Sequence, residues 1–332
     1  MIELLFLLLP IAAAYGWYMG HRSAQKDRED FSNKFSRDYV TGVNFLLSNQ
    51  TEKAVDLFLN MLQKQEAENE IESDSQFEAE LTLGNLFRSR GEVDRALRIH
   101  QALDRSPNYT FEQKLLAKQQ LAKDFMAVGF YDRAENLYIT LVDEPEFAGG
   151  ALQQLAVIYQ KTKEWKKAIN VAEKLAKIDP KEDNIELAQY YCEYVQALPN
   201  GHKENPQQIL QQALKVAPGC VRASMMLADL NIAQQDYQSA VRILENVLNQ
   251  NPNYIGEVLP QLKECYRQLD QLDNFELFLI KASRENNNSA VALMLADLIE
   301  EKDGRAAAQL QLYQQLQQNP ATLIFHRFIQ YQ

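Results

Sequence analysis

The side chains best suited to chemistry, histidine and cysteine, are few and widely separated in this sequence. They are His21, His100, His202 and His326, with Cys192, Cys220 and Cys265. The cysteines form no Cys-x-x-Cys pair, which excludes a zinc ribbon or a thioredoxin-type redox site built from them. The sequence also lacks the metalloprotease, nucleophile-elbow, P-loop and dinucleotide motifs. We therefore expect no enzyme activity and no cofactor or metal site, and we expect the three thiols to be free and buried.

A cluster of arginines is the strongest candidate for binding chemistry. Residues 83–100 read LGNLFRSRGEVDRALRIH, in a chain with 34 Lys and Arg against 45 Asp and Glu. Asn85 and Arg88 are three residues apart and so share one helix face. Together they are suited to hold a carboxylate or a backbone carbonyl of a bound segment, and we predict that they line a partner-binding groove. The alternative is that they pair with acids of this chain, as we expect for Arg95 and Arg98.

An internal repeat predicts the elements that position these residues. In helix-pair repeats of about 34 residues, a small residue lies near position 8 and an alanine at position 20. The position-20 alanines lie at residues 54, 96, 134, 168, 240 and 308, in steps of 42, 38, 34, 72 and 68. The last two steps are close to two repeats each. The signature residues are Gly42, Ala54, Gly84, Ala96, Ala122, Ala134, Ala156, Ala168, Ala228, Ala240, Ala296 and Ala308.

This spacing predicts an all-α, tetratricopeptide-repeat superhelical solenoid of about eight units over residues 35–320. The units near residues 187–218 and 255–286 are degenerate, and residues 321–332 are expected to form the first helix of an incomplete further unit. His100 falls at position 24, which is a packing position. A solenoid of this kind binds peptides or partner domains, mainly on the concave face of its first helices. The net charge of −11 repels phosphate backbones and so argues against nucleic acid as a partner.

An apolar segment at the N-terminus predicts one transmembrane helix over residues 1–20. Eighteen residues of helix span about 27 Å, which is enough to cross the hydrocarbon core. Basic residues follow the segment, so the positive-inside rule places the solenoid in the cytoplasm, after a polar connector at residues 21–34. The alternative is a cleaved signal peptide and a periplasmic solenoid. The anchor residues are Leu4, Leu5, Phe6, Leu7, Leu8 and Leu9, followed by the interfacial aromatics Tyr15, Trp17 and Tyr18.

The segments ELLFLLLPIAAAYGWYMGHRSAQ, SRDYVTGVNFLLSNQ and LTLGNLFRSRGEVDRALRIHQ carry a specific resemblance. They resemble the lipopolysaccharide assembly protein B family of Gram-negative bacteria, and the resemblance continues through YDRAENLY, GALQQLAVIYQ and MLADLIE. It implies a single-pass protein of the bacterial inner membrane that acts as an adaptor in the control of lipopolysaccharide synthesis. The implied partners are the committed-step deacetylase of lipid A synthesis and a membrane-bound AAA metalloprotease. A second inner-membrane regulator and lipopolysaccharide itself are further candidates.

The resemblance also marks one departure. Members of this family end in a rubredoxin-like zinc ribbon with two cysteine pairs, whereas the positions that would match it do not exist in this sequence, which reaches Gln332 after LIFHRFIQYQ. No metal ligands are therefore transferred to this chain. The sequence leaves open the oligomeric state, and it leaves open a second function, a structural scaffold for envelope-biogenesis enzymes with no role in proteolysis.

Overall fold

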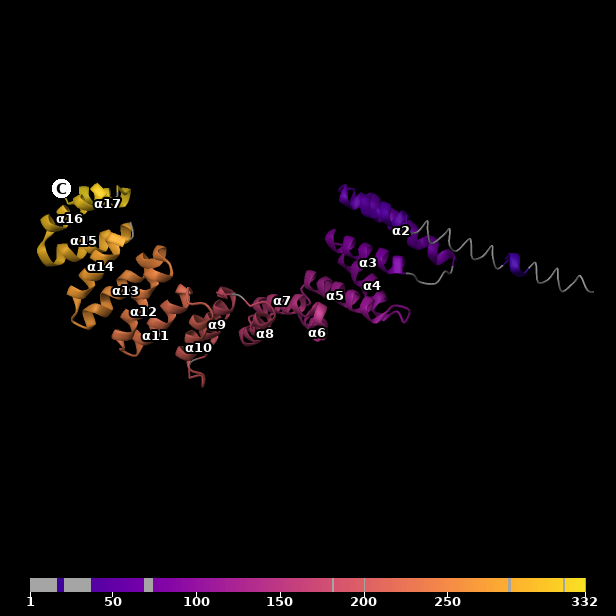
Figure 1. The fold of residues 1–332 in the computed structure, drawn as a ribbon, viewed down its shortest axis with the longest axis horizontal. Helices are drawn as coiled ribbons and strands as arrows, with labels where there is room; N and C mark the ends of the chain where they lie inside the picture. The colour runs from indigo at the N-terminus through magenta and orange to yellow at the C-terminus, as the bar shows by residue number, and fades with distance from the viewer. Residues whose placement is uncertain are drawn as a thin grey trace, which may run out of the picture. The chain divides into compact units, whose positions relative to one another are not determined.

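The computed structural model describes residues 17–20, 37–68, 74–180, 182–199, 201–285, 288–318 and 320–331. Every regular element within these ranges is helical (Figure 1). The chain divides into two compact units, residues 1–151 and 152–332. Each unit is a stack of antiparallel helix pairs, and this arrangement is the tetratricopeptide-type solenoid that the repeat spacing predicts.

Unit 1 contains a helix over residues 37–47 and five further helices, and α7 crosses the boundary between the units. These are α2 (Thr51–Glu68), α3 (Asp74–Ser89), α4 (Val93–Arg105), α5 (Phe111–Ala127), α6 (Tyr131–Val142) and α7 (Pro145–Thr162).

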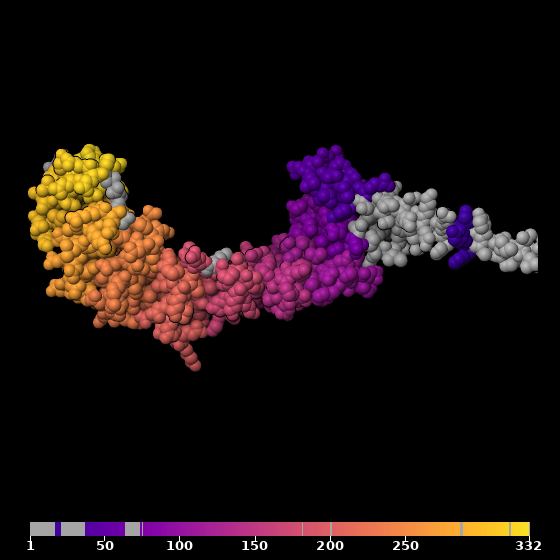
Figure 2. All heavy atoms as spheres, viewed as in Figure 1, coloured from indigo at the N-terminus to yellow at the C-terminus, as the bar shows by residue number. Residues whose placement is uncertain are grey.

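Unit 2 continues the alternation, and in the space-filling view its helices form one continuous body (Figure 2). Its elements are α8 (Trp165–Ile178), α9 (Ile185–Ala197), α10 (Pro206–Val216), α11 (Val221–Ala233), α12 (Tyr237–Gln250), the short 3₁₀ helix η1 (Pro252–Tyr254), α13 (Ile255–Gln268), α14 (Leu272–Glu285), α15 (Ser289–Asp303), α16 (Arg305–Gln318) and α17 (Thr322–Gln330).

A left-handed residue joins the two helices of most repeats. We call the odd-numbered helices and the 37–47 helix first helices, and the even-numbered helices second helices. Between them lies a residue with φ between 57° and 81°, which lets the chain reverse within two or three residues. It is glycine in the second and third repeats, where no Cβ is strained, and a larger residue in four others. Positive-φ glycines, Gly201 and Gly304, also lie between α9 and α10 and between α15 and α16. The turn residues are Asn49, Gly91, Gly129, Lys163, Gln235 and Asp270.

The small residues of the signature lie where the two helices of a repeat touch. All six position-20 alanines have an exposed fraction of 0 %. A Cβ placed on Gly84 would lie 2.3 Å from Nε2 of the buried His100 in α4, and one on Gly42 would lie 2.6 Å from the ring of Phe58 in α2. The bulky partner on the second helix therefore occupies the space that a side chain on the first helix would need.

The repeat around residues 255–286 keeps the same spacing between turn residue and position 20, but it has a different residue at position 20. Asp270 is its left-handed turn residue, and Phe275 follows five residues later, as Ala240 follows Gln235. Phe275 is fully buried at 0 % exposure, and its ring packs 5.5 Å from that of Tyr266. Three buried free cysteines also belong to unit 2, namely Cys192, Cys220 and Cys265, as expected from the sequence.

Successive repeats are joined mainly by the second helix of one repeat packing on the first helix of the next, as α4 packs on α5 and α12 on α13, and first helices also contact each other. The helix pairs in close contact include α3 with α5, α9 with α11, α13 with α15, and α15 with α17, whereas no pair of second helices is among them in the described part of the chain. The surface formed by the second helices is therefore grooved between neighbouring repeats.

The predicted membrane anchor lies almost wholly outside the described residues. Of residues 1–20, the structure describes only 17–20, and the connector at 21–34 is likewise outside its range. Within the described ranges, none of the helices combines the length and the apolar character that crossing a bilayer requires.

The contact of Gly84 with His100 gives a stability prediction. Gly84→Ala should lower the free energy of unfolding by about 1–3 kcal/mol, because the added methyl overlaps a buried ring that has no room to move. Gly150→Ala in α7 is the control, since nothing lies within 4 Å of its Cβ position and alanine favours helix over glycine. Urea unfolding followed by circular dichroism measures both, and equal midpoints for the two variants would contradict the packing argument.

Candidate protein-interaction site

The predicted pair Asn85 and Arg88 lies on α3 and forms part of a hydrogen-bonded network with the next repeat. Nη1 of Arg88 donates to Oδ1 of Asp124 at 2.8 Å and to the carbonyl oxygen of Gln120 at 3.2 Å. Nη2 of Arg88 donates to Oδ1 of Asn85 at 2.6 Å and to Oε1 of Gln120 at 2.9 Å. All four terminal N–H groups of the guanidinium therefore have partners within the protein.

Asp124 is the centre of this network. Its carboxylate is fully buried, and its second oxygen, Oδ2, accepts a hydrogen bond from Nδ1 of His100 at 2.5 Å. The ring of His100 is also fully buried, with Nε2 lying 3.4 Å from the carbonyl oxygen of Leu81. One carboxylate of α5 thus joins α3 and α4 of the preceding repeat, and the charge of Arg88 compensates its burial.

Tyr138 of α6 is adjacent to the same charges. Burial raises the pKa of its phenol to about 12, and the charge of Asp124 contributes in the same direction while that of Arg88 opposes it. Its hydroxyl is buried and has no hydrogen-bond partner among the described residues. The phenol therefore stays neutral through the physiological pH range and serves as a packing group.

Sequence reasoning identified two members of this network as a pair and missed the residues that hold them. Asn85 and Arg88 are brought together, but the carboxylate that Arg88 holds belongs to this chain. Asn85 keeps a side-chain NH₂ group that donates no hydrogen bond within the described residues. Binding of a partner by the pair stays a prediction. A signal for Asp124 exists in the sequence, since an acid between the predicted core positions Ala122 and Phe125 requires a cation.

The neighbouring arginines, Arg90 in the turn before α4 and Arg95 and Arg98 within it, form ion pairs with acids of this chain only in part. Arg95 pairs with Glu92 at 2.8 Å, as expected, and its guanidinium lies 3.8 Å from the ring centroid of Phe87. Arg90 also contacts Glu92, at 3.1 Å. Arg98 is exposed and has no ion pair among the described residues.

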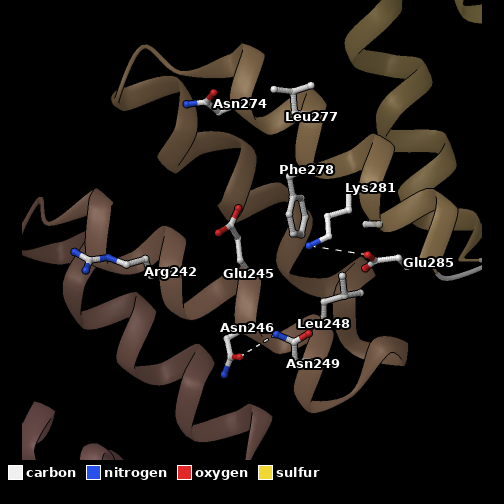
Figure 3. A pocket seen from close by; sticks show the side chains of 11 residues that line it. Arg242, Glu245, Asn246, Leu248, Asn249, Asn274, Leu277, Phe278, Lys281 and Glu285 are labelled. Atoms are coloured by element: carbon white, nitrogen blue, oxygen red, sulfur yellow. Dashed lines mark hydrogen bonds and ion pairs between the residues drawn. The ribbon is translucent and has the colours of Figure 1, made fainter.

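A groove between the second helices α12 and α14 is a second candidate surface, in unit 2. It has a volume of about 480 Å³. Figure 3 shows Glu245 from α12, and Phe278 and Lys281 from α14, pointing into the space between the two helices. Leu277 on its rim is 65 % exposed. The lining therefore mixes apolar and charged side chains.

Several polar groups of this groove already have hydrogen-bond or ion-pair partners within the protein. Glu245 accepts a hydrogen bond from the hydroxyl of Tyr266 at 2.5 Å, and Lys281 lies 3.9 Å from Glu285. Nδ2 of Asn249 donates to Oδ1 of Asn246 at 3.2 Å (Figure 3). The groove carries both signs of charge, so its rim gives no preference for an anionic or a cationic partner.

These features define the class of protein. Residues 151–186 match the tetratricopeptide repeat model, and residues 222–292 match a model described as the fifth armadillo-repeat domain of TT21. The chain is a tetratricopeptide-repeat solenoid, and this fold works by binding other proteins across the surfaces of its stacked helices. Within the described residues, there is no group of three or more histidine, cysteine or acidic side chains placed to hold a metal ion.

The chain belongs to the lipopolysaccharide assembly protein B family. It is 76 % identical to the lipopolysaccharide assembly protein B of Haemophilus influenzae over 332 residues, which is 100 % of this chain and 84 % of that protein. It is 49 % identical to the protein of the same name from Escherichia coli K12, over 100 % of this chain and 83 % of that protein.

Solved structures of other repeat proteins are more distant. The C-terminal part of a TPR repeat-containing protein from Cytophaga hutchinsonii is 15 % identical, with a TM-score of 0.43, and the match covers 87 % of this chain and 98 % of that one. A tetratricopeptide repeat protein from Parabacteroides merdae is 13 % identical, with a TM-score of 0.35, over 90 % of this chain and 98 % of that one.

The burial of Asp124 gives a second stability prediction. Asp124→Ala should lower the free energy of unfolding by about 3–5 kcal/mol, because the fully buried His100 and the guanidinium of Arg88, whose side chain is only 20 % exposed, then lose their shared acceptor. Asp273→Ala is the matched control, since Asp273 pairs with Lys302 at 2.9 Å while its side chain is 88 % exposed. Urea unfolding compares the two, and a loss no larger than that of the control would show that the network adds little.

Proposed function

We propose that this protein is a membrane-tethered cytoplasmic adaptor that regulates lipopolysaccharide synthesis. In this role it presents the committed-step deacetylase of lipid A synthesis to a membrane-bound AAA metalloprotease for degradation. The observation that carries the proposal is 76 % identity along the whole chain to a protein named for lipopolysaccharide assembly. The stacked repeats support it further, because grooves such as the one between α12 and α14 suit an adaptor that holds other proteins.

Tethering gives the adaptor a physical advantage. If residues 1–20 anchor the chain in the inner membrane, adaptor and protease share one surface. Their effective concentration then rises without any new contact between them. The repeats are left to recognise the deacetylase, and the anchor is left to hold the complex beside the protease. A second inner-membrane regulator and lipopolysaccharide are further candidate ligands under this proposal.

Removal of the gene tests the adaptor role directly. The cellular level of the deacetylase should rise several-fold, because its degradation loses the protein that presents it to the protease. Quantitative immunoblotting after a block of protein synthesis measures the half-life of the deacetylase, with a cytoplasmic protein of unrelated function as control. An unchanged half-life would favour a scaffold for envelope-biogenesis enzymes that takes no part in proteolysis.

Deletion of residues 1–20 tests the tether. At native expression levels, the chain of residues 21–332 should fold and remain in the soluble fraction but should fail to restore deacetylase degradation. The expected loss follows from the effective-concentration argument, so strong overexpression should recover part of the activity. Full restoration by the soluble chain at native levels would make the tether irrelevant.

A further inference from the structure

A pocket in unit 1, distinct from the Arg88 network, combines an apolar floor with two arginines. It lies between the second helices α4 and α6, above the first helix α5, and has a volume of about 360 Å³. We call it the α4–α6 pocket. Its lining consists of Gln101, Asp104 and Arg105 from α4, Leu121 and Phe125 from α5, and Arg133, Asn136 and Leu137 from α6.

The floor of the pocket is apolar. Leu121 and Phe125 are almost entirely buried from solvent, at 5 % and 6 % exposure, and Leu137 is half-buried beside them. An apolar side chain placed on this floor would exchange water for hydrocarbon contact on several sides. The volume falls within the range of about 300–1,000 Å³ typical of ligand pockets.

The two arginines lie on opposite walls and have no carboxylate partner among the described residues. Arg105 is the last residue of α4, and Arg133 lies in the first turn of α6. The guanidinium of Arg133 lies 5.5 Å from the ring centroid of Phe125 and 5.3 Å from that of Phe130, so it is held over the floor by aromatic rings. The one acid in the lining, Asp104, is bound by Lys118.

The two amides of the pocket are equally available. Gln101 and Asn136 make no side-chain hydrogen bonds within the described part of the chain, although they border the same space. Amide groups at such positions suit the carbonyl and N–H groups of a peptide backbone. Other arginines, such as Arg98 and Arg284, also lack an ion pair within the described ranges, but Arg105 and Arg133 differ from them because both border an apolar pocket.

The combination of an apolar floor and two arginines is not a general feature of the repeats. In unit 2 the same place in the repeat frame is lined by Leu227 and Asn231 of α11 and by Ser239 of α12. There the amide oxygen of Asn231 accepts a hydrogen bond from Nε2 of Gln207 at 3.0 Å. Among its described lining residues, that groove has no phenylalanine on its floor, and its arginine, Arg242, lies in the second turn of α12 and not in the first.

We propose that the α4–α6 pocket binds an acidic–apolar peptide segment of a partner protein. A carboxylate side chain of the segment pairs with Arg105 and Arg133, and a neighbouring side chain of leucine or phenylalanine size rests on Leu121, Phe125 and Leu137. The net charge of −11 disfavours a polyanion or an anionic membrane as occupant, whereas one or two carboxylates beside arginines are accommodated. The proposal deepens the adaptor function by giving the chemistry of a segment that the adaptor recognises.

Peptide selection on the purified full-length chain in detergent tests the proposal. A displayed library of random peptides is selected on the wild type, and the enriched peptides are synthesised and measured by fluorescence anisotropy. The enriched sequences should place Asp or Glu within two residues of Leu or Phe. Arg105→Gln/Arg133→Gln should weaken their binding at least tenfold, as expected for loss of charge-assisted hydrogen bonds.

A matched control separates the pocket from net charge. Lys177→Gln/Arg284→Gln removes the same two positive charges from exposed residues outside the pocket, neither of which has an ion pair among the described residues. This variant should bind the peptides as the wild type does. Replacing the peptide's acid by its amide should also cost about tenfold on the wild type and little on Arg105→Gln/Arg133→Gln.

Several outcomes would overturn the proposal. These are selection of no peptide, enrichment of peptides without an acid, equal binding by both double variants, or arginine-dependent binding of phosphatidylglycerol vesicles in place of peptides. Circular dichroism must show that the variants are folded, and Arg105→Lys/Arg133→Lys, which keeps the charge, should recover part of the affinity. The measurement is independent of deacetylase turnover in cells, so a failure of the pocket and a failure of the adaptor role are distinguishable.

Discussion

The close approach of the two helices within each repeat is the constraint on which the rest of this structure depends. At Gly84 a single methyl group would overlap the ring of His100, and the six position-20 alanines are fully excluded from solvent. Helices packed at this distance need a chain reversal of two or three residues, and a left-handed residue provides it. Each second helix then packs on the first helix of the next repeat, the first helices also touch, and grooves remain between successive second helices such as α4 and α6 or α12 and α14.

The same steric demand explains how much of the fold could be predicted from the sequence. A small residue is required wherever a bulky one faces it, so the alanine and glycine spacing indicates the helix pairs and their order. The repeat around residues 255–286 shows the limit of that reasoning. Phe275 fills position 20 and is as well buried as the alanines, so this position is excluded from solvent without being small. The repeat spacing therefore predicts where this unit lies, but it does not predict which residues form its core.

The candidate sites were less predictable because their groups come from different repeats. Asp124 is 36 residues from Arg88, and only the stacking of α5 on α3 brings the two together. Helix periodicity places Asn85 and Arg88 on one face but gives no information about which residue of the next repeat lies opposite. The pairing of Arg105 with Arg133 could not be predicted for the same reason, since neither has a near neighbour in sequence that indicates a pocket.

The contrast between Arg88 and the pair Arg105 and Arg133 links the fold to its function. Arg88 uses all four terminal N–H groups inside the protein, and the network around Asp124 thereby fixes α3, α4 and α5 relative to one another. The α4–α6 pocket is built on two of those three helices. Its floor and one of its walls are therefore held in place before any ligand arrives, which lowers the entropic cost of binding. Arg88, whose hydrogen bonds are all made within the protein, thus helps to fix the helices that present Arg105 and Arg133, which have no carboxylate partner among the described residues.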